Sequence, residues 1–460
     1  MYWTNFLHIY QPPTQKSMWV KKIANESYRK ITKGLKENPK AKLTLNINAT
    51  LVELLERNGC LDVVEDLRTL AEKGQIEFTD SAKYHAFLPL LPEKEIKRQI
   101  ELNRETNQKY FGKIYQPKGF FPTEMGYSRK IGEIAADLGY QWIILDELAC
   151  SGKVGALAPD TIYTLKGKEN LKVFFRDRET SFRILSAQVG MSVFSSNMLV
   201  KLLGERVNKE EYLITAMDGE TFGHHRPGLE ELLFDLYKTK ELKGVFISEL
   251  ENFFTKREVV DPLDSSWALM KRDLEQNTPF SRWKNEDNQI QMWQWELTNL
   301  AINEVEKLSP EDPVYPKVRK ALDRALHSDQ YWWASAQPWW SIEMMEGGAK
   351  EFKNILQILP IDQQKKDYAK ELYLKIIQEA FDWQRSGKVE ELSKLADEDV
   401  TQRITTETPY IPKEEFDQIV KNLENQMLTA AENKEYERAA QIRDRVKELK
   451  EKEKEITNIK

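Results

Sequence analysis

Two acidic residues stand where a short apolar run ends and a loop begins. Glu124 follows two phenylalanines and a proline, and Asp218 follows the apolar run 212–217. If both runs are strands of one barrel, their carboxyl ends meet at the same mouth. Two carboxyl groups there, one ionised and one protonated, are the minimum apparatus for cleaving a glycosidic bond. Two other interpretations stay open, with Glu124 as a surface loop acid and Asp218 as the cap of the following turn.

Further polar residues lie in the loops that follow the other apolar runs. A sugar site needs a few well-placed polar groups for the hydroxyls, together with flat apolar faces for the rings. The candidates for substrate binding are His8, Gln11, Glu77, His85, Glu220 and His224. The tryptophans of the C-terminal half offer flat faces, although ordinary core packing explains any single one of them equally well.

A second chemistry is open at the loop that follows residue 217. Asp218, His224 and His225 are residue types that can hold a divalent metal, which would activate water as in barrel deacetylases. Adjacent side chains such as those of the two histidines rarely converge on one ion. We therefore expect neither a metal nor a cofactor. His327 has no partner that the sequence reveals, and it receives no role.

The elements that would position these residues follow from the patterning of the chain. Short β-rich runs alternate with longer amphipathic runs from residue 2 to about 247, which is typical of βα units around a parallel sheet. Seven strands are expected, at residues 2–9, 41–47, 75–79, 118–121, 141–145, 212–217 and 244–247. Apolar residues at helical spacing lie between them, in runs such as 18–36, 61–73, 93–110 and 228–241.

The same patterning divides the chain into three parts. Residues 1–255 are predicted to form a (β/α)7 barrel with an insertion at about 151–211, which fits the alternation poorly. Strand signals then fade, so residues 256–400 are expected to form a helical domain that completes the substrate cleft. After a Thr- and Pro-containing linker at 401–412, two apolar stripes around a polar turn predict a two-helix hairpin over 413–452.

The loops resemble, in the same order, the motifs of glycoside hydrolase family 57 across roughly residues 1–390. The matching motifs are the histidine near Gln-Pro at 8–12, Gly-x-x-Glu at 74–77, FPTE at 121–124 and DGETFG at 218–223. The resemblance implies an α/β fold with an incomplete seven-unit TIM-like barrel. It also implies retaining chemistry on α-glucans, with Glu124 as nucleophile and Asp218 as general acid/base. The family commonly has a histidine where this chain has Tyr10. Its fifth motif falls loosely around 265–267, which makes Trp267 a further candidate for substrate binding.

The C-terminal hairpin separately resembles the UVR motif, through which two subunits of the bacterial excision nuclease interact. The residues that carry this resemblance are Leu423, Met427, Ala430, Ala431, Tyr436, Ala439, Ala440, Arg443 and Asp444. It implies a protein partner rather than a role in DNA repair. The alternative is a plain amphipathic hairpin that docks on its own enzyme.

Composition excludes several other classes of function. A net charge of −6 gives no general attraction to nucleic acid or to anionic membranes. No apolar run is long enough to span a membrane, and the start of the chain does not read as a secretion signal. Cys60 and Cys150 are too few for a disulfide framework, and both are expected to fill the core. A cytoplasmic protein is therefore expected.

The sequence thus predicts a retaining hydrolase or glucanotransferase, of the α-amylase or 4-α-glucanotransferase type. Its substrate would be an α-glucan or maltooligosaccharide, and it would act by double displacement. Retention predicts carboxyl groups of Glu124 and Asp218 about 5 to 5.5 Å apart. Two alternatives remain, namely a metal-dependent polysaccharide deacetylase and a non-catalytic glucan-binding scaffold that localises a partner through the hairpin.

Overall fold

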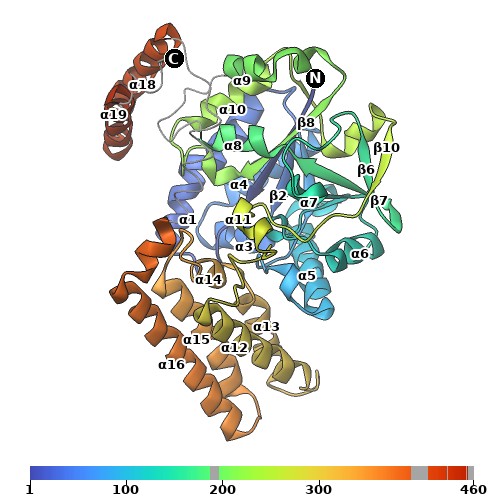
Figure 1. Cartoon of the computed structure of the whole chain (residues 1–460), viewed down its shortest axis with the longest axis vertical. Coiled ribbons are helices and arrows are strands. Elements are labelled where there is room, and N and C mark those ends of the chain that lie inside the picture. The colour runs from blue at the N-terminus through green and yellow to red at the C-terminus, as the bar shows by residue number, and fades with distance from the viewer. Residues whose placement is uncertain (187–195, 395–412, 433, 452, 454–460) are drawn as a thin grey trace.

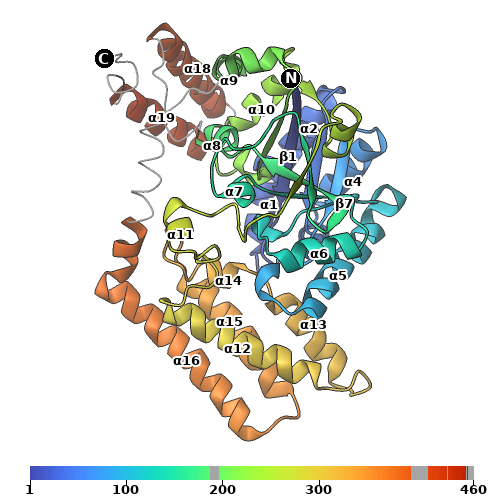
Figure 2. The ribbon, with the colours of Figure 1, turned by 45° about the vertical axis from the view of Figure 1, so that its right-hand side comes forward.

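The computed structural model describes residues 1–186, 196–394, 413–432, 434–451 and 453. It has three parts, which are a curled sheet wrapped by helices, a helical bundle below it, and a two-helix hairpin beside the sheet (Figure 1). Figures 1 and 2 both place α11 (Lys271–Glu275) and α14 (Asp329–Trp332) where the bundle meets the barrel. The predicted architecture of barrel, helical region and hairpin is confirmed.

In the described residues, ten strands form one open, curled sheet. Its order is β10-β6-β7-β5-β4-β3-β2-β1-β8, and β9 pairs with β1. All pairings are parallel except that of β6 with β7. Parallel strands covered on both faces read as continuous apolar runs, which is why the sequence revealed them. The strands are β1 (Tyr2–Ile9), β2 (Leu43–Ile47), β3 (Ile76–Asp80), β4 (Gly119–Phe120), β5 (Trp142–Asp146), β6 (Ile162–Leu165), β7 (Lys168–Arg176), β8 (Tyr212–Asp218), β9 (Lys243–Gly244) and β10 (Arg257–Val260).

Helices cover the outer side of this sheet (Figures 1 and 2). They include the four amphipathic runs that the sequence predicts, although the first of these is broken by a π-helical turn at Ala24–Tyr28. The helices are α1 (Ser17–Ile23), α2 (Arg29–Glu37), α3 (Ala49–Arg57), α4 (Leu61–Glu72), α5 (Glu93–Phe111), α6 (Arg129–Asp137), α7 (Leu148–Ser151), α8 (Arg178–Ser186), α9 (Ser196–Leu203) and α10 (Leu229–Lys238).

The segment expected to be an insertion, 151–211, contributes directly to the sheet. Its strand β7 pairs in parallel with β5, with Ile143 opposite Val173. The sequence signal for β7 was weak because residues 168–170 are polar and at least partly exposed at the turn from β6. The gap between β7 and β8 is bridged by the Asp177 N–H, which donates to the Ile214 carbonyl at 2.7 Å.

The register of the sheet places several polar residues at one level. His8 lies opposite both Asn46 on β2 and Asp218 on β8, and Asn46 lies opposite Thr79 on β3. Below this level the interior of the barrel is filled by a buried apolar cluster. It includes Phe6, Phe121, Met125, Trp142, Ile144, Phe174, Ile214 and Phe254. The polar level therefore forms the floor of the mouth.

The helical bundle follows β10 and continues the core of the barrel. Trp283 and Leu297 of the bundle belong to the same buried cluster as Ile96 and Ile131 of the barrel helices. Arg319 joins the two parts through a bidentate ion pair with Glu95, at 2.7 and 2.8 Å. The remaining helices of the bundle are α12 (Gln289–Glu306), α13 (Tyr315–Ala325), α15 (Ile342–Ile358) and α16 (Gln363–Ser386).

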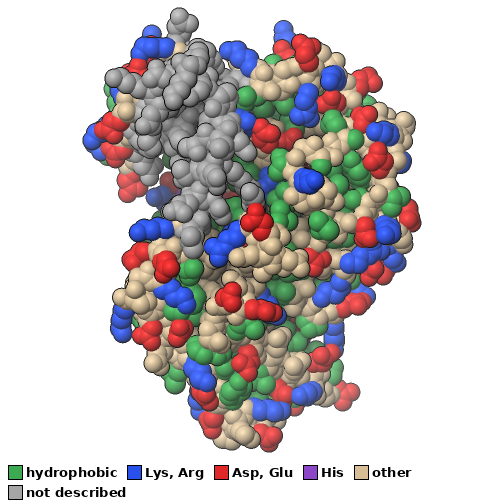
Figure 3. All heavy atoms as spheres, viewed as in Figure 1, with side chains coloured by type: hydrophobic (Ala, Val, Ile, Leu, Met, Phe, Trp, Pro, Cys, Tyr) green, Lys and Arg blue, Asp and Glu red, His purple; other side chains and the backbone are tan. Residues whose placement is uncertain are grey.

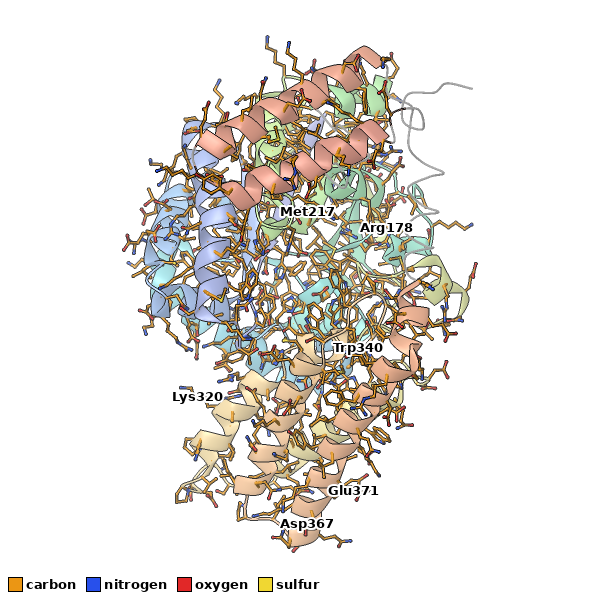
Figure 4. The ribbon with its side chains drawn as sticks, turned by 90° about the vertical axis from the view of Figure 1, so that its left-hand side faces the viewer. Arg178, Met217, Lys320, Trp340, Asp367 and Glu371 are labelled. Atoms are coloured by element: carbon orange, nitrogen blue, oxygen red, sulfur yellow. The ribbon has the colours of Figure 1, made fainter. Side chains whose placement is uncertain are left out.

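The hairpin consists of α18 (Lys413–Glu432) and α19 (Tyr436–Glu451), which pack side by side near α9 (Figures 1 and 4). Glu437 forms an exposed ion pair with Lys22 of α1 at 3.4 Å. On the described part of the face seen in Figure 3, acidic and basic side chains are interspersed. Of the helices that the structure describes, none has the length and apolar character to cross a bilayer.

Candidate active site

Glu124 lies in a strained turn directly after β4. Its φ of 61° and that of Met125 at 49° fall in the left-handed region, which is uncommon for residues other than glycine. The turn is held by two bonds from Trp267, whose backbone N–H donates to the Glu124 carbonyl and whose indole N–H donates to Glu124 Oε2 at 2.5 Å. Backbone strain of this kind costs free energy and clusters at functional sites. The carboxyl group is thus held in one orientation.

Asp218 is the last residue of β8, beside His8 of β1. Its side chain makes no capping hydrogen bond to the turn that follows, so the interpretation as a helix cap does not hold. Burial raises the pKa of Asp218 to about 6, against the opposing charge of Arg176. Capping of the following turn therefore does not explain the position of this carboxyl group.

The two carboxyl groups share a raised affinity for protons. Burial raises the pKa of Glu124 to about 8, and the charge of Asp218 raises it further, while the indole N–H of Trp267 opposes both effects. Because these pKa values are about 6 and about 8, the pair carries one proton near neutral pH. One acid and one carboxylate are therefore available together.

Two neutral histidines form the floor beside this pair. His8 Nδ1 bonds to Asn46 Oδ1 at 2.8 Å, and His8 Nε2 lies 3.1 Å from His85 Nε2. The Asn46 amide N–H donates to Thr79, so its oxygen accepts from His8 and leaves His8 Nε2 as an acceptor. His85 Nε2 is then the donor, and it also lies 3.4 Å from Glu124 Oε1. Burial lowers the pKa of His8 to about 4, and that of His85 also falls well below its usual value.

Asp329 is a site residue that the sequence did not reveal. It begins α14 in the helical bundle, and its Oδ2 accepts from the Tyr10 hydroxyl at 2.6 Å and bonds to His327 Nδ1 at 2.9 Å. Tyr10 in turn stacks on His85, with ring centroids 3.9 Å apart. Burial would raise the pKa of Asp329, but the bonds from His327 and Tyr10 hold it below its usual value. The unassigned His327 thus has a partner two residues away.

A buried charge cluster behind the pair was also missed. Asp146 at the end of β5 accepts from Arg176 at 2.7 Å and from Arg178 at 2.8 Å. Both guanidinium groups donate to the Trp267 carbonyl at 3.1 Å, and that of Arg176 also donates to the Ala216 carbonyl. Since one carboxylate faces two guanidinium groups, a positive charge remains to act on Asp218. The cluster orients Trp267, which holds Glu124.

The structure separates the other predicted residues into two groups. Glu220 lies beside the mouth, where its Oε1 accepts from the Tyr28 hydroxyl at 2.5 Å, from the Tyr10 N–H at 3.0 Å and from Gln11 at 3.4 Å. Glu220 and Gln11 thereby hold the loop that follows β1. The other two predicted residues, Glu77 and His224, lie apart from the carboxyl pair.

Glu77 lies one side-chain layer below the polar level, opposite Thr44, and its Oε1 accepts from the Thr44 hydroxyl at 3.1 Å and the Ser248 N–H at 3.4 Å. His224 Nδ1 lies 2.7 Å from Glu26 Oε2, rather than next to Asp218. Within the described residues, no group of three or more His, Cys, Asp or Glu side chains is arranged to hold a metal ion. The metal chemistry proposed for Asp218, His224 and His225 therefore has no support in this geometry.

Comparison with known proteins agrees with this architecture. The chain is 27% identical over 241 residues to an α-amylase of Pyrococcus horikoshii, covering 51% of this chain and 36% of that protein. Its structure resembles that of the 4-α-glucanotransferase of Thermococcus litoralis, with a TM-score of 0.61, 20% identity, and coverage of 79% of this chain and 61% of that one. It also resembles the GH57-type branching enzyme of Pyrococcus horikoshii, with a TM-score of 0.62, 17% identity, and coverage of 81% and 94%.

Two family profiles match separate parts of the sequence. Residues 417–452 match the UvrB/uvrC motif, in agreement with the hairpin of α18 and α19. Residues 5–263 match glycosyl hydrolase family 57, and this segment contains both carboxyl residues and all of the sheet except the first three residues of β1. The chain spans about a third of the length of its α-amylase relative, so the match does not extend to that protein's remaining segments. The protein is a member of glycosyl hydrolase family 57 that carries a C-terminal UVR motif.

Proposed function

We propose that the protein is a retaining enzyme that acts on α-glucans such as maltooligosaccharides. The observation that carries the proposal is the pair of partly buried carboxyl groups, Glu124 and Asp218, which come from separate strand ends and hold one proton between about pH 6 and pH 8. This is the apparatus that double displacement at a sugar requires. The names of the relatives, which include α-amylase and 4-α-glucanotransferase, supply the substrate class.

In this proposal Glu124 attacks the anomeric carbon while Asp218 protonates the departing glycosidic oxygen. The bond from carbon to that oxygen breaks, and a covalent glycosyl ester on Glu124 forms. Asp218 then removes a proton from the acceptor, which displaces Glu124 and restores the configuration. The free site favours the proton on Glu124, because its pKa is the higher of the two. Binding of the sugar must therefore move the proton to Asp218, where the glycosidic oxygen takes it up.

The indole of Trp267 and the imidazole of His85 stabilise the ionised nucleophile. The indole N–H has no acceptor capacity, so its 2.5 Å bond to Glu124 Oε2 favours the carboxylate. The one N–H of His85 Nε2 donates to His8 Nε2 at 3.1 Å, and it reaches the other oxygen of Glu124, at 3.4 Å, only as a shared donor. We expect the carboxyl groups of Glu124 and Asp218 to stand about 5 to 5.5 Å apart when sugar is bound, as retention requires.

The acceptor decides between hydrolysis and transfer. Water gives shorter glucans, whereas a sugar hydroxyl gives new chains, and the outcome depends on how well the site excludes water. A direct test is to incubate the purified protein with maltooligosaccharides, with and without a chelator, and to analyse the lengths, linkages and anomeric form of the products. Retained configuration without chelator sensitivity supports the proposal. Chelator-sensitive release of acetate from an acetylated polysaccharide would favour the deacetylase alternative, and binding of maltooligosaccharides without turnover would favour the glucan-binding scaffold.

The hairpin supports a separate role in protein interaction. Its apolar residues pack between α18 and α19 or toward the barrel, while Leu428 and Tyr436 stay exposed. We propose that it binds a protein partner, as the name of the matching UvrB/uvrC motif suggests. This role is independent of the chemistry, because none of the described hairpin residues is among the groups around Glu124 and Asp218.

A further inference from the structure

Trp339 is the most exposed of the twelve tryptophans in the chain. It lies in the loop between α14 and α15 with 46% of its surface exposed, whereas most of the other tryptophans are buried or partly buried. Its ring meets that of Trp333 edge to face, with centroids 5.5 Å apart and planes at 69°. A single exposed apolar ring is ordinary on a protein surface, and it is the position of this pair of rings relative to the active site that suggests a ligand.

Trp333 lies on the same helix face as Asp329 of the active site, and Trp339 packs against Trp333. The Trp333 N–H bonds to the Asp329 carbonyl at 2.9 Å, and residues four apart on a helix lie on the same face. Asp329 receives the hydroxyl of Tyr10 at the mouth. The loop after β1 also meets the start of α15, where Lys16 pairs with Glu343 at 3.0 Å. Figure 4 shows the neighbouring Trp340 where the bundle meets the barrel. The two rings therefore lie just outside the mouth.

The loop that presents these rings is held by hydrogen bonds from both sides. Within it, the Ala336 N–H donates to the Trp339 carbonyl at 2.9 Å, and the Ser341 N–H donates to the Trp333 carbonyl at 3.0 Å. From outside, Arg282 donates to the Gln337 side chain at 2.5 Å. Ala336 keeps a φ of 54°, so the loop holds a conformation that costs free energy. A ring held in this way loses little entropy when a ligand binds.

We propose that Trp339 and Trp333 form a stacking site for an α-linked glucan chain that extends out of the mouth. The site rests on the proposed function for its ligand class and adds to it a second binding region beyond the reacting sugars. The apolar face of a glucose ring fits the flat indole. Two planes set at an angle suit the α-1,4 chain, because this chain turns from one residue to the next. Long chains then reach the site, and short ones do not.

Binding measured by calorimetry in a Glu124→Gln background tests this site without turnover. Trp339→Ala is expected to weaken the binding of maltoheptaose about three- to tenfold, while maltotriose binds as before. Trp339→Phe keeps a ring and should retain most of the affinity. The matched control is Phe253→Ala, since Phe253 is also exposed and stacks on Tyr2 at 4.4 Å, at the first residue of β1 and so at the far end of the barrel.

Three results would overturn the stacking site. These are unchanged maltoheptaose binding by Trp339→Ala, an equal loss for both sugars, and an equal loss in Phe253→Ala. The proposed function fails separately, when the Glu124→Gln protein binds maltoheptaose but the unmodified protein never converts it. The two measurements thus distinguish failure of the proposed stacking site from failure of the proposed catalytic function.

Discussion

The mouth of the barrel and the C-terminal hairpin differ in what holds their polar side chains, which are remote partners at the mouth and neighbouring exposed partners in the hairpin. At the mouth, Tyr10 bonds to Asp329 across 319 residues of sequence, and both side chains are partly buried. In the hairpin, ion pairs such as Lys450 with Glu424 join exposed side chains of two adjacent helices. Burial lowers the pKa of His8 to about 4 and raises those of Glu124 and Asp218 to about 8 and about 6. An exposed ion pair contributes little to stability. Chemistry is therefore expected from the first region and not from the second.

The largest effect should follow from removing either carboxyl group of the pair. Glu124→Ala and Asp218→Asn are each expected to lower kcat by several decades, since they remove the nucleophile or the general acid. Turnover of maltooligosaccharides measures the loss, and circular dichroism checks that folding is intact. Glu147→Gln is the matched control, because Glu147 is also buried with a pKa raised to about 8 but lines a different cavity. Near-normal turnover in either variant would remove that residue from the mechanism.

A smaller effect is expected from the charge cluster behind the pair. Asp146→Asn leaves the buried guanidinium groups of Arg176 and Arg178 without their carboxylate, which should cost about 3 to 5 kcal/mol of the free energy of unfolding. Urea denaturation measures this cost. The added positive charge should also move both limbs of the pH profile of activity to lower pH. A variant with lower stability but an unmoved profile would give the cluster a structural role only.

The next effect concerns pH in the unmodified protein. Below pH about 6 both carboxyl groups are protonated and the nucleophile is lost, and above pH about 8 both are ionised and the acid is lost. The kcat/KM for a maltooligosaccharide should therefore form a bell with a maximum near pH 7, falling about tenfold per pH unit on each side. A profile that is flat from pH 5 to pH 9 would contradict the shared proton.

The contrast between the two regions also explains what the sequence could predict. The hairpin follows from apolar spacing within some forty residues, and Glu124 and Asp218 follow from motifs at strand ends, so both were accessible locally. Asp329 was missed because its partner Tyr10 is remote, although the run 327–333 combines a histidine, an aspartate and two tryptophans. Arg176 and Asp146 also end apolar runs, as Asp218 does, but they were missed because no sequence motif marks them. Their ion pair depends on the pairing of β5 with β7, which places Asp146 opposite Arg176.

The smallest effect should follow from removing the hairpin, residues 413–460. Helices α18 and α19 pack chiefly on each other, although Phe416 and Val420 join the buried cluster that contains Leu199 of α9. The ion pair from Lys22 to Glu437 is exposed and worth at most about 1 kcal/mol. Turnover should therefore stay within about twofold, and the unfolding midpoint should fall by only a few degrees. Product analysis and a thermal melt of the shortened chain measure both quantities. A tenfold loss of turnover would mean that the hairpin shapes the substrate cleft, and the separation of chemistry from interaction in this molecule would not hold.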